Sequence, residues 1–295
     1  MGKNAKKEYL KRISALDNVV GNCIDVSRKY TGIKSPTGAH FYASVLFTVL
    51  CTRAVSLAIL APHSQWSKKL IEHWDYASMA TLTRSILEIR LAFFYLCFEK
   101  CTKEEWDCRW NIYNLHDCTA RISLFEEFQS KESEIAGFRK QADELRTRLT
   151  TNNYFLNLPE GDRKKFLHGK SAFMQPLERI AERAKVDVHS FRWLYKFFSS
   201  HVHGYPLSFY RMGEQDRGRG VESDVEVGYS SLCLSFSVTL LVAARDEMEK
   251  LFKGVKMPNP RLSPTASNEP VEGSFSGLIF QCKLFFKSLF NKRNN

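Results

Sequence analysis

The residues most suggestive of chemistry lie in the run FRWLYKFFSSHVHG, residues 191–204. Side chains three and four residues apart share one face of a helix. A helix here would therefore carry one polar stripe: Arg192, Lys196, Ser199 and His203. A cationic stripe that ends in a histidine suits ligand binding through phosphate, or general acid–base work on RNA. The ordinary alternative is a solvated face whose last histidine interacts with the carboxyl end of the helix.

The same spacing indicates which histidine could act with the arginine. His201 lies nine residues beyond Arg192 and would point to nearly the opposite side of a helix. His203 shares the face of Arg192. If the protein is an enzyme, we therefore expect a metal-independent ribonuclease in which His203 and Arg192 are the catalytic residues.

A second polar pair, Arg84 and Glu88, lies in the apolar run TLTRSILEIRLAFFYL. The two residues are four apart and so share one helix face. A helix that is apolar on most sides is usually buried, so we expect this pair to be buried and Arg53 to be a candidate further partner. The pair could be structural, fixing how helices dock, or it could add to a ligand-binding site within the bundle.

The chain resembles a bacterial family of all-helical domains of unknown function with HEPN-like bundle character, over about residues 42–210. Arg53 in CTRAVSLAIL, the Arg84/Glu88 segment and the run FFSSHVHG carry the resemblance. HEPN-like proteins include ribonucleases of toxin and phage-defence systems, which cleave RNA with an arginine that is separated from a histidine by four to six residues. The resemblance therefore implies a helical bundle and an RNA-cleaving toxin as one possible activity.

The arginine–histidine spacing occurs three times outside the FFSSHVHG run: Arg109 to His116, Arg163 to His168, and Arg183 to His189. Matches of this kind arise by chance in a chain rich in arginine. Within FFSSHVHG, Arg192 and His201 are too far apart for the pattern. The spacing therefore carries little weight, and RNA cleavage stays an alternative.

The eight cysteines do not form a recognisable metal motif. Four soft ligands follow one another closely, but no CxxC knuckle is present, so buried thiols are expected in preference to a zinc site: Cys97, Cys101, Cys108 and Cys118, with His116 among them. We expect no metal and no cofactor. The charged N-terminus does not look like a signal peptide, which favours a cytoplasmic chain with reduced thiols.

Composition and apolar spacing predict an all-α, multi-helix bundle domain over residues 1–254. Gly and Pro are scarce over the first two hundred positions, and hydrophobic content is an ordinary 44%. Residues 41–61 are long and apolar enough for a membrane span, but Arg53 near the middle favours a core helix. The expected helices cover about residues 5–30, 40–61, 67–100, 104–128, 131–149, 176–185, 187–204 and 229–253, with loops at 152–161 and 211–228.

The composition changes after the bundle. Residues 255–274 hold four prolines and few apolar side chains, which predicts a flexible, disordered linker. Residues 275–295 predict a separate, basic C-terminal amphipathic helix, too short at about 24 Å for its apolar stretch to span a bilayer. It fits an anionic membrane surface or a partner protein, and packing onto its own domain is the alternative. The contact residues would be Phe275, Ile279, Lys283, Phe286, Lys287 and Phe290.

The net charge of +11 favours polyanionic partners. The hypothesis is a helical interaction or effector module of bacterial stress or phage-defence type, which binds RNA, another polyanion or a partner protein. One alternative is a HEPN-like RNA-cleaving toxin in antiviral defence. The other is a scaffolding protein attached peripherally to the inner face of the membrane through its C-terminal helix. A homo-oligomer is compatible with each of these.

Overall fold

A computed structural model of the protein describes residues 2–209 and 218–255. The C-terminal helix expected at 275–295, and all of the expected linker except Val255, lie outside the described residues. Their assignment as a disordered linker and an amphipathic membrane or partner contact therefore stays a prediction.

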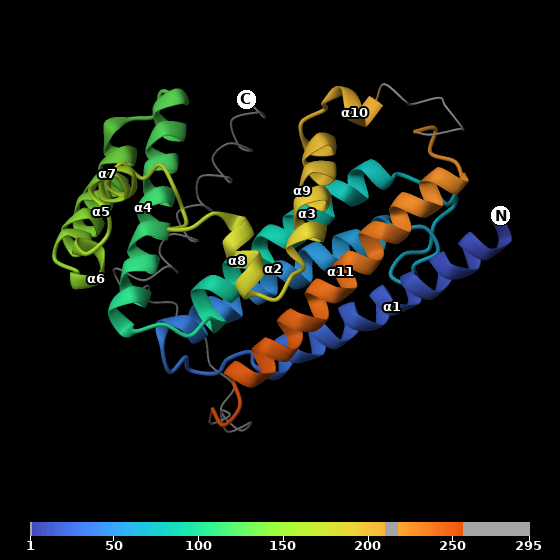
Figure 1. Ribbon diagram of the computed structural model, residues 1–295, viewed down its shortest axis with the longest axis horizontal. Helices are drawn as coiled ribbons and strands as arrows, with labels where there is room; N and C mark the ends of the chain where they lie inside the picture. The colour runs from blue at the N-terminus through green and yellow to red at the C-terminus, as the bar shows by residue number, and fades with distance from the viewer. Residues whose placement is uncertain (1, 210–217, 256–295) are drawn as a thin grey trace, which may run out of the picture. The chain divides into compact units, whose positions relative to one another are not determined.

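The described part of the chain is all-α, as predicted (Figure 1). The one β-bridge among the described residues joins Trp74 to Gly220. In chain order the helices are α1 (Gly2–Lys29), α2 (Gly38–Leu60), α3 (Tyr76–Phe93), the π-helix η1 (Phe94–Phe98), α4 (Lys103–Glu127), α5 (Glu132–Thr150), α6 (Asn153–Leu156), α7 (Glu160–Leu167), α8 (Leu177–Arg183), α9 (Val188–Val202), α10 (Pro206–Phe209) and α11 (Asp224–Leu251).

Capping residues explain where the helices begin. Thr37 precedes α2 and Asp187 precedes α9, and each accepts a hydrogen bond from a backbone N–H of the first turn. Ser223 does the same for α11, where Glu226 three residues later completes the sequence of a capping box. The expected start of this last helix near residue 229 was therefore five residues late, because the glycines around it suggested a loop.

The helix expected at 67–100 is shorter in the structure. Asp75 accepts a hydrogen bond from the N–H of Ser78 at 3.0 Å and starts α3 there. The residues before it form a loop, and the Lys69 ammonium of this loop bonds the carbonyls of Leu60 and Ala61 at the end of α2. The loop expected at 152–161 also contains α6 and the beginning of α7, which are too short to show a clear apolar period.

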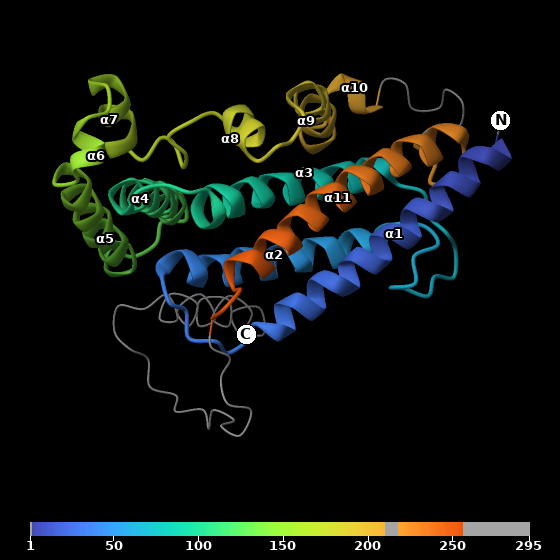
Figure 2. The ribbon, with the colours of Figure 1, turned by 60° about the horizontal axis from the view of Figure 1, so that its bottom comes forward.

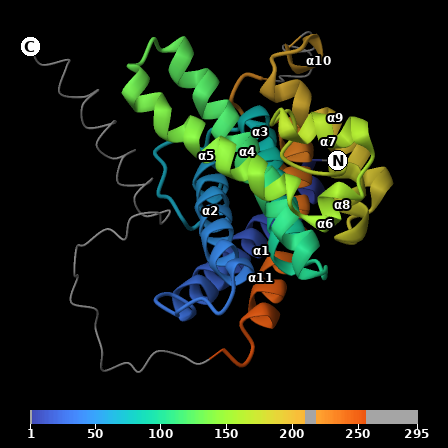
Figure 3. The same cartoon turned by 90° about the vertical axis from the view of Figure 1, so that its left-hand side faces the viewer.

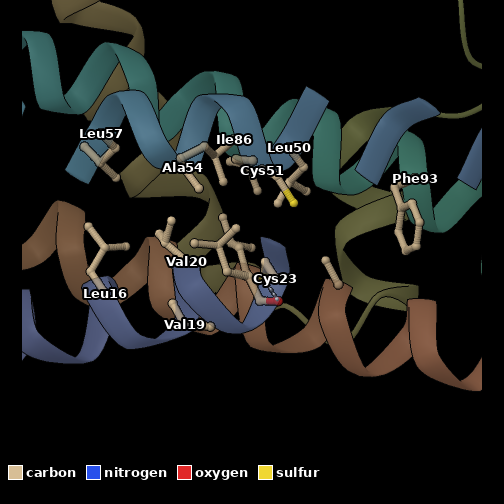
Figure 4. Close-up of a cluster of buried hydrophobic side chains, with 14 of the residues drawn as sticks. Leu16, Val19, Val20, Cys23, Leu50, Cys51, Ala54, Leu57, Ile86 and Phe93 are labelled. Carbon is tan, nitrogen blue, oxygen red and sulfur yellow. Dashed lines mark hydrogen bonds between the residues drawn. The ribbon is translucent and has the colours of Figure 1, made fainter. Parts of the chain in front are cut away.

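The main core lies between α1, α2, α3 and α11, with α8 and α9 packed on α3 (Figures 1 and 2). Complete burial of each large aliphatic or aromatic side chain contributes about 1.5–3 kcal/mol. Figure 4 shows core residues from α1, α2 and α3: Leu16, Val19, Val20, Cys23, Leu50, Cys51, Ala54, Leu57, Ile86 and Phe93.

A second core is built by α4, α5, α6 and α7, with α4 and α5 side by side (Figure 3). Cys108 and Leu115 of α4 meet Leu145 and Leu149 of α5 in this cluster. Met174, in the segment before α8, packs against both cores. The charged helix expected at 131–149 is α5, and it pairs with α4 through its apolar side.

Two described helices, α2 and α11, are long and apolar enough to cross a membrane by length and composition. Within the bundle, 39% of the most apolar window of α2 and 50% of that of α11 are buried. Helix α2 buries the side chains of Phe47, Leu50 and Leu57 in the main core, as expected of a core helix. Arg53 was expected as a candidate further partner of the Arg84–Glu88 pair. Instead it lies on the exposed face of α2 and has no ion-pair partner in the described part of the chain.

Candidate functional site

The outward side of α9 displays two of the basic side chains that the sequence singled out. Arg192 is exposed and donates from Nη2 to Glu178 of α8 at 2.6 Å. Lys196, one turn later, is also exposed, and no carboxylate of the described residues forms an ion pair with it. Helix α9 has no acidic residue between 188 and 202. The outer face of α9 is therefore positive apart from the contribution of Glu178.

The two remaining residues of the stripe are placed differently. The Ser199 hydroxyl donates to the carbonyl of Tyr195 at 2.5 Å, so its proton is used within the helix. His203 caps the end of α9, is exposed, and lies 5.3 Å from the ring of Tyr205. Arg192 and His203 are eleven residues apart, which is about 16 Å along a helix. The stripe exists, but these two residues do not converge on one phosphate.

Exposed apolar side chains lie among these polar groups. Trp193 is 42% exposed, Val202 42% and Tyr205 56%. Beside Trp193 a groove of about 470 Å³ runs between α1, α9 and α11. Its remaining lining residues are Arg12, Asp224, Val225, Gly228, Tyr229 and Leu232. The outer face of α9 thus combines cations with accessible aromatic rings and a neighbouring hollow.

Arg84 and Glu88 form the expected ion pair, with Nε and Oε1 3.1 Å apart. The Tyr195 side chain of α9 completes the cluster, because its hydroxyl accepts from Arg84 Nη2 and donates to Glu88 Oε1, each at 3.1 Å. The guanidinium also lies 4.7 Å from the Tyr195 ring centroid. Burial, followed by the charge of Glu88, raises the pKa of Tyr195.

The expectation that this pair is buried is wrong. The Arg84 side chain is 15% exposed and that of Glu88 41% exposed, because the pair lies at the edge of the α3–α9 contact. Arg84 Nη1 is nevertheless shielded from solvent, and no group of residues 2–209 or 218–255 forms a hydrogen bond with it. The cluster joins α3 to the inward side of α9, and no hydrogen bond connects it to Arg192, Lys196 or His203 among the described residues.

His201 occupies an aromatic environment that the sequence did not reveal. Its ring meets Tyr76 of α3 at 5.2 Å and Phe197 of α9 at 4.8 Å between centroids. Tyr229 of α11 stacks on the Phe197 ring and lies tilted against the Tyr76 ring, with centroids 5.1 and 4.9 Å apart. Both ring nitrogens of His201 are buried without a partner in the described structure, and burial lowers its pKa against the opposing effect of Asp75. The spacing correctly separated His201 from Arg192.

Two buried ionic groups were also missed. Arg90 of α3 is 1% exposed and bonds Glu247 of α11 at 2.6 Å. Arg109 of α4 is 5% exposed and bonds Glu99 at 2.6 Å and Glu105 at 2.5 Å. Only the Arg109–Glu105 pair has the i, i+4 spacing that a sequence can show. The other contacts join segments that only the fold brings together.

Two of the three arginines that precede a histidine at the RNase-like spacing, Arg109 and Arg183, form structural contacts within the bundle. Arg109 also donates to the carbonyl of Tyr95 at 2.9 Å, within η1. Arg183 bonds the same Glu99 that binds Arg109. His116 bonds the carbonyl of Gly169 at 2.7 Å instead of facing Arg109. The contacts of Arg109 and Arg183 fix α4 and α8 to η1 and to Glu99 directly after it.

The cysteines of the described chain are free thiols, and most are buried. Burial raises the pKa of Cys108 and Cys118, to about 12 and about 11. Over residues 2–209 and 218–255, no three His, Cys, Asp or Glu side chains are grouped as metal ligands would be. Cys97 and Cys118 therefore lie in the bundle as packing residues, in the main and the second core.

Comparison with known proteins gives one match. A family model described as a family of unknown function (DUF5677) matches residues 40–220. Neither the curated proteins nor the solved structures gave a match. The matched region contains α3 to α10 and all but the first two residues of α2, and so includes Arg84, Glu88 and the outer face of α9, whereas α1 and α11 lie outside it. Because this region is more than half of the 295 residues, the chain belongs to the DUF5677 family.

Proposed function

We propose that the protein is a non-catalytic helical interaction module that binds a polyanion, with single-stranded RNA as the class that fits best. The binding surface is the outer face of α9, and it is made of Arg192, Trp193, Lys196, His203 and Tyr205. The observation that supports it is the alternation of cations and exposed aromatic rings on a helix without acidic residues.

The length of this surface favours an extended ligand. Arg192 and His203 lie about 16 Å apart, so one phosphate cannot contact both, whereas successive phosphates of a single strand can. Arginine binds phosphate in a bidentate manner and lysine binds it as a point charge. Stacking of bases on Trp193 and Tyr205 would add about 1–3 kcal/mol per base, without dependence on sequence.

The geometry gives less support to the HEPN-like RNase alternative. A general acid or base must lie within hydrogen-bond reach of the proton that it moves. Arg192 is three helical turns from His203, and Glu178 holds its guanidinium. Arg109 and Arg183 are engaged by Glu99. Arg109 and Arg183 are therefore held by a carboxylate and are not free to bind a phosphate beside a histidine.

Glu178 makes the proposal testable in two directions. It neutralises Arg192, so it competes with any phosphate for the guanidinium. Glu178→Gln should therefore strengthen RNA binding, while Lys196→Gln and Trp193→Ala weaken it. Lys164→Gln is the control, because Lys164 is an exposed lysine of α7 that lies outside this surface, and its ion pair within the described part of the chain is with Glu160 of the same helix.

The assay is fluorescence anisotropy of a labelled single-stranded RNA with the full-length chain over a range of salt concentrations. Loss of one phosphate contact should lower the slope of log K against log salt by about one. Binding that is equal in wild type, Lys196→Gln and Trp193→Ala would refute the surface. A gel of the same samples records cleavage, and RNA cleaved by wild type but not by His203→Ala would replace this proposal with the enzyme.

A role in bacterial stress or phage defence belongs to the same proposal as its cellular context. An RNA-binding effector should arrest growth when its expression is induced, and Lys196→Gln should relieve that arrest. Arrest that persists in a variant without RNA affinity would separate the cellular effect from the outer face of α9.

A further inference from the structure

The groove between α1, α9 and α11 borders the outer face of α9, and the proposed RNA surface does not use it. Its volume of about 470 Å³ lies within the range of small-ligand sites in proteins, about 300–1,000 Å³. Trp193 contributes the indole ring of α9, and Arg12 contributes the side chain of α1. Helix α11 supplies the other lining residues. A groove of this size can hold a single nucleobase with its ribose.

Contacts within the bundle hold the sides of this groove in place. The Tyr229 ring stacks on Phe197 of α9 and packs on Tyr76 of α3, with centroids 5.1 and 4.9 Å apart. Arg12 Nη1 donates to the carbonyl of Ser231 in α11 at 3.4 Å. The groove is therefore preformed. Trp193, at 42% exposure, leaves part of its ring accessible to a ligand.

A glycine in α11 keeps part of the groove open. Gly228 lies inside the helix and is not among the described glycines with a positive φ. A glycine in a helix interior lowers stability relative to alanine. A Cβ added at Gly228 would meet no atom within 4 Å. Neither backbone conformation nor packing therefore requires glycine at this position, and a larger side chain would fill open space along the groove.

Two charged residues line the groove, one of each sign. Asp224 is exposed, and no basic group of residues 2–209 or 218–255 forms an ion pair with it. Arg12 is held at the level of Ser231, seven residues further along α11 and so about 10 Å from Asp224 along the helix. Glu8 lies 4.0 Å from Arg12 and 3.3 Å from Lys11, so it is shared. The groove thus offers a hydrogen-bond-accepting carboxylate at one end and a cation at the other.

This arrangement of groups fits a guanine nucleotide. An ionised carboxylate only accepts hydrogen bonds, and it can accept two parallel bonds. Guanine presents its N1–H and its N2 amine side by side on the Watson–Crick edge, the edge that proteins read in single strands. Adenine and cytosine each present one amine there. Uracil presents one N–H between two carbonyl oxygens, which repel a carboxylate.

We propose that the groove is the base-reading site of the RNA surface on α9 and that it takes one guanine. The base stacks on Trp193, its N1–H and N2 amine donate to Asp224, and Arg12 contacts a phosphate of the same strand. This inference rests on the proposed function, because Trp193 belongs both to the surface and to the groove. It adds a base preference to contacts that are otherwise independent of sequence.

The test is fluorescence anisotropy of the full-length chain with uridine strands that carry one central guanosine, inosine or adenosine. The guanosine preference is the ratio of the affinities for the guanosine and adenosine strands, because both purines stack. Wild type should bind the guanosine strand about 10-fold more tightly, as expected of a bidentate contact. Inosine lacks the N2 amine, so the inosine strand should lose most of this advantage.

Two substitutions should remove the guanosine preference for different reasons. Asp224→Asn keeps the size of the side chain and replaces the ionised acceptor. Gly228→Leu fills the groove. The matched control is Gly137→Leu, at an exposed helical glycine of α5 whose Cβ would also meet no atom within 4 Å, and it should keep the wild-type preference. Both leucine variants should melt at or above the temperature of wild type, because leucine favours a helix more than glycine does.

The results separate this inference from the function on which it rests. Wild type that binds no strand would overturn both. Wild type that binds all strands equally, with an affinity that still depends on Lys196, would overturn the base-reading site alone. A guanosine preference that survives in Asp224→Asn or in Gly228→Leu would overturn it too, since the base would then be read elsewhere.

Discussion

Two arginines of helix α3, six residues apart, each pair with a glutamate in different surroundings. Arg84 bonds Glu88 on the next turn of its own helix, and the two side chains are 15% and 41% exposed. Arg90 bonds Glu247 of α11, 157 residues away in the sequence, and these side chains are 2% and 13% exposed. Local spacing predicts the first pair. The second pair depends on how α11 packs on α3.

The two pairs also differ in how well their polar atoms are satisfied. Tyr195 gives the Arg84–Glu88 pair two additional hydrogen bonds. Within the described part of the chain, the Arg90–Glu247 pair has one hydrogen bond, and Arg90 Nη1 and Glu247 Oε2 are buried without partners. Burial lowers the pKa of Arg90 and raises that of Glu247, and pairing only partly offsets both effects. The buried pair therefore fixes how α11 docks and adds little net stability.

The largest effect is expected from breaking the buried pair. Glu247→Met strands the charge of Arg90 in the core and should lower the free energy of unfolding by about 3–5 kcal/mol. The double variant Arg90→Met/Glu247→Met removes both charges and should recover most of this loss. Urea unfolding of the wild type and the three variants of this cycle measures it. A double variant as unstable as Glu247→Met would show that the pair contributes more than its desolvation costs.

A smaller loss of stability is expected from Glu99, which forms ion pairs with two arginines. Glu99 bonds Arg109 and Arg183, so Glu99→Gln weakens two charge-assisted contacts at once. Arg109 keeps Glu105 and the carbonyl of Tyr95, which limits the loss to about 2 kcal/mol. Because Glu99 lies between α4 and α8, hydrogen exchange should rise in both helices. Unchanged exchange there would mean that the network does not hold α4 and α8 in place.

The sequence alone predicts the structural features that depend only on residues close together in the chain. Asp187, at the start of the helix expected at 187–204, could be recognised as a helix cap, and Arg84 with Glu88 as a pair, because these features need only local spacing. Arg90 could not be paired in this way, since no acidic residue lies three or four positions from it on α3. The stripe from Arg192 to His203 was found correctly as a face. Its length of about 16 Å then excluded a compact catalytic site.

The half-buried pair should tolerate a change that the buried pair does not. Had Arg84 and Glu88 been fully buried, loss of one charge would cost about 3–5 kcal/mol. With Glu88 at 41% exposure, Glu88→Gln should lower the free energy of unfolding by only about 0.5–1 kcal/mol. Urea unfolding measures this, with Glu132→Gln as a control for loss of one exposed ion pair, that with Arg139. A loss as large as that of Glu247→Met would contradict the comparison.

The smallest effect on the free energy of unfolding is expected at His201, and it should appear only as a change in the pH dependence of that free energy. Burial among Tyr76, Phe197 and Tyr229 lowers the pKa of His201 in the folded state below its ordinary value of about 6.5. The unfolded chain therefore binds this proton more readily than the folded protein does. Stability rises with pH across the window below about 6.5, and it falls as acid protonates the unfolded state.

His201→Phe keeps an aromatic ring among its neighbours and removes the titrating group. The difference in the free energy of unfolding between wild type and this variant should therefore shift in favour of the variant as pH falls from about 8 to about 5.5. Parallel curves for wild type and His201→Phe would mean that His201 titrates alike in both states. Its two unpartnered nitrogens would then have to reach water in the native protein.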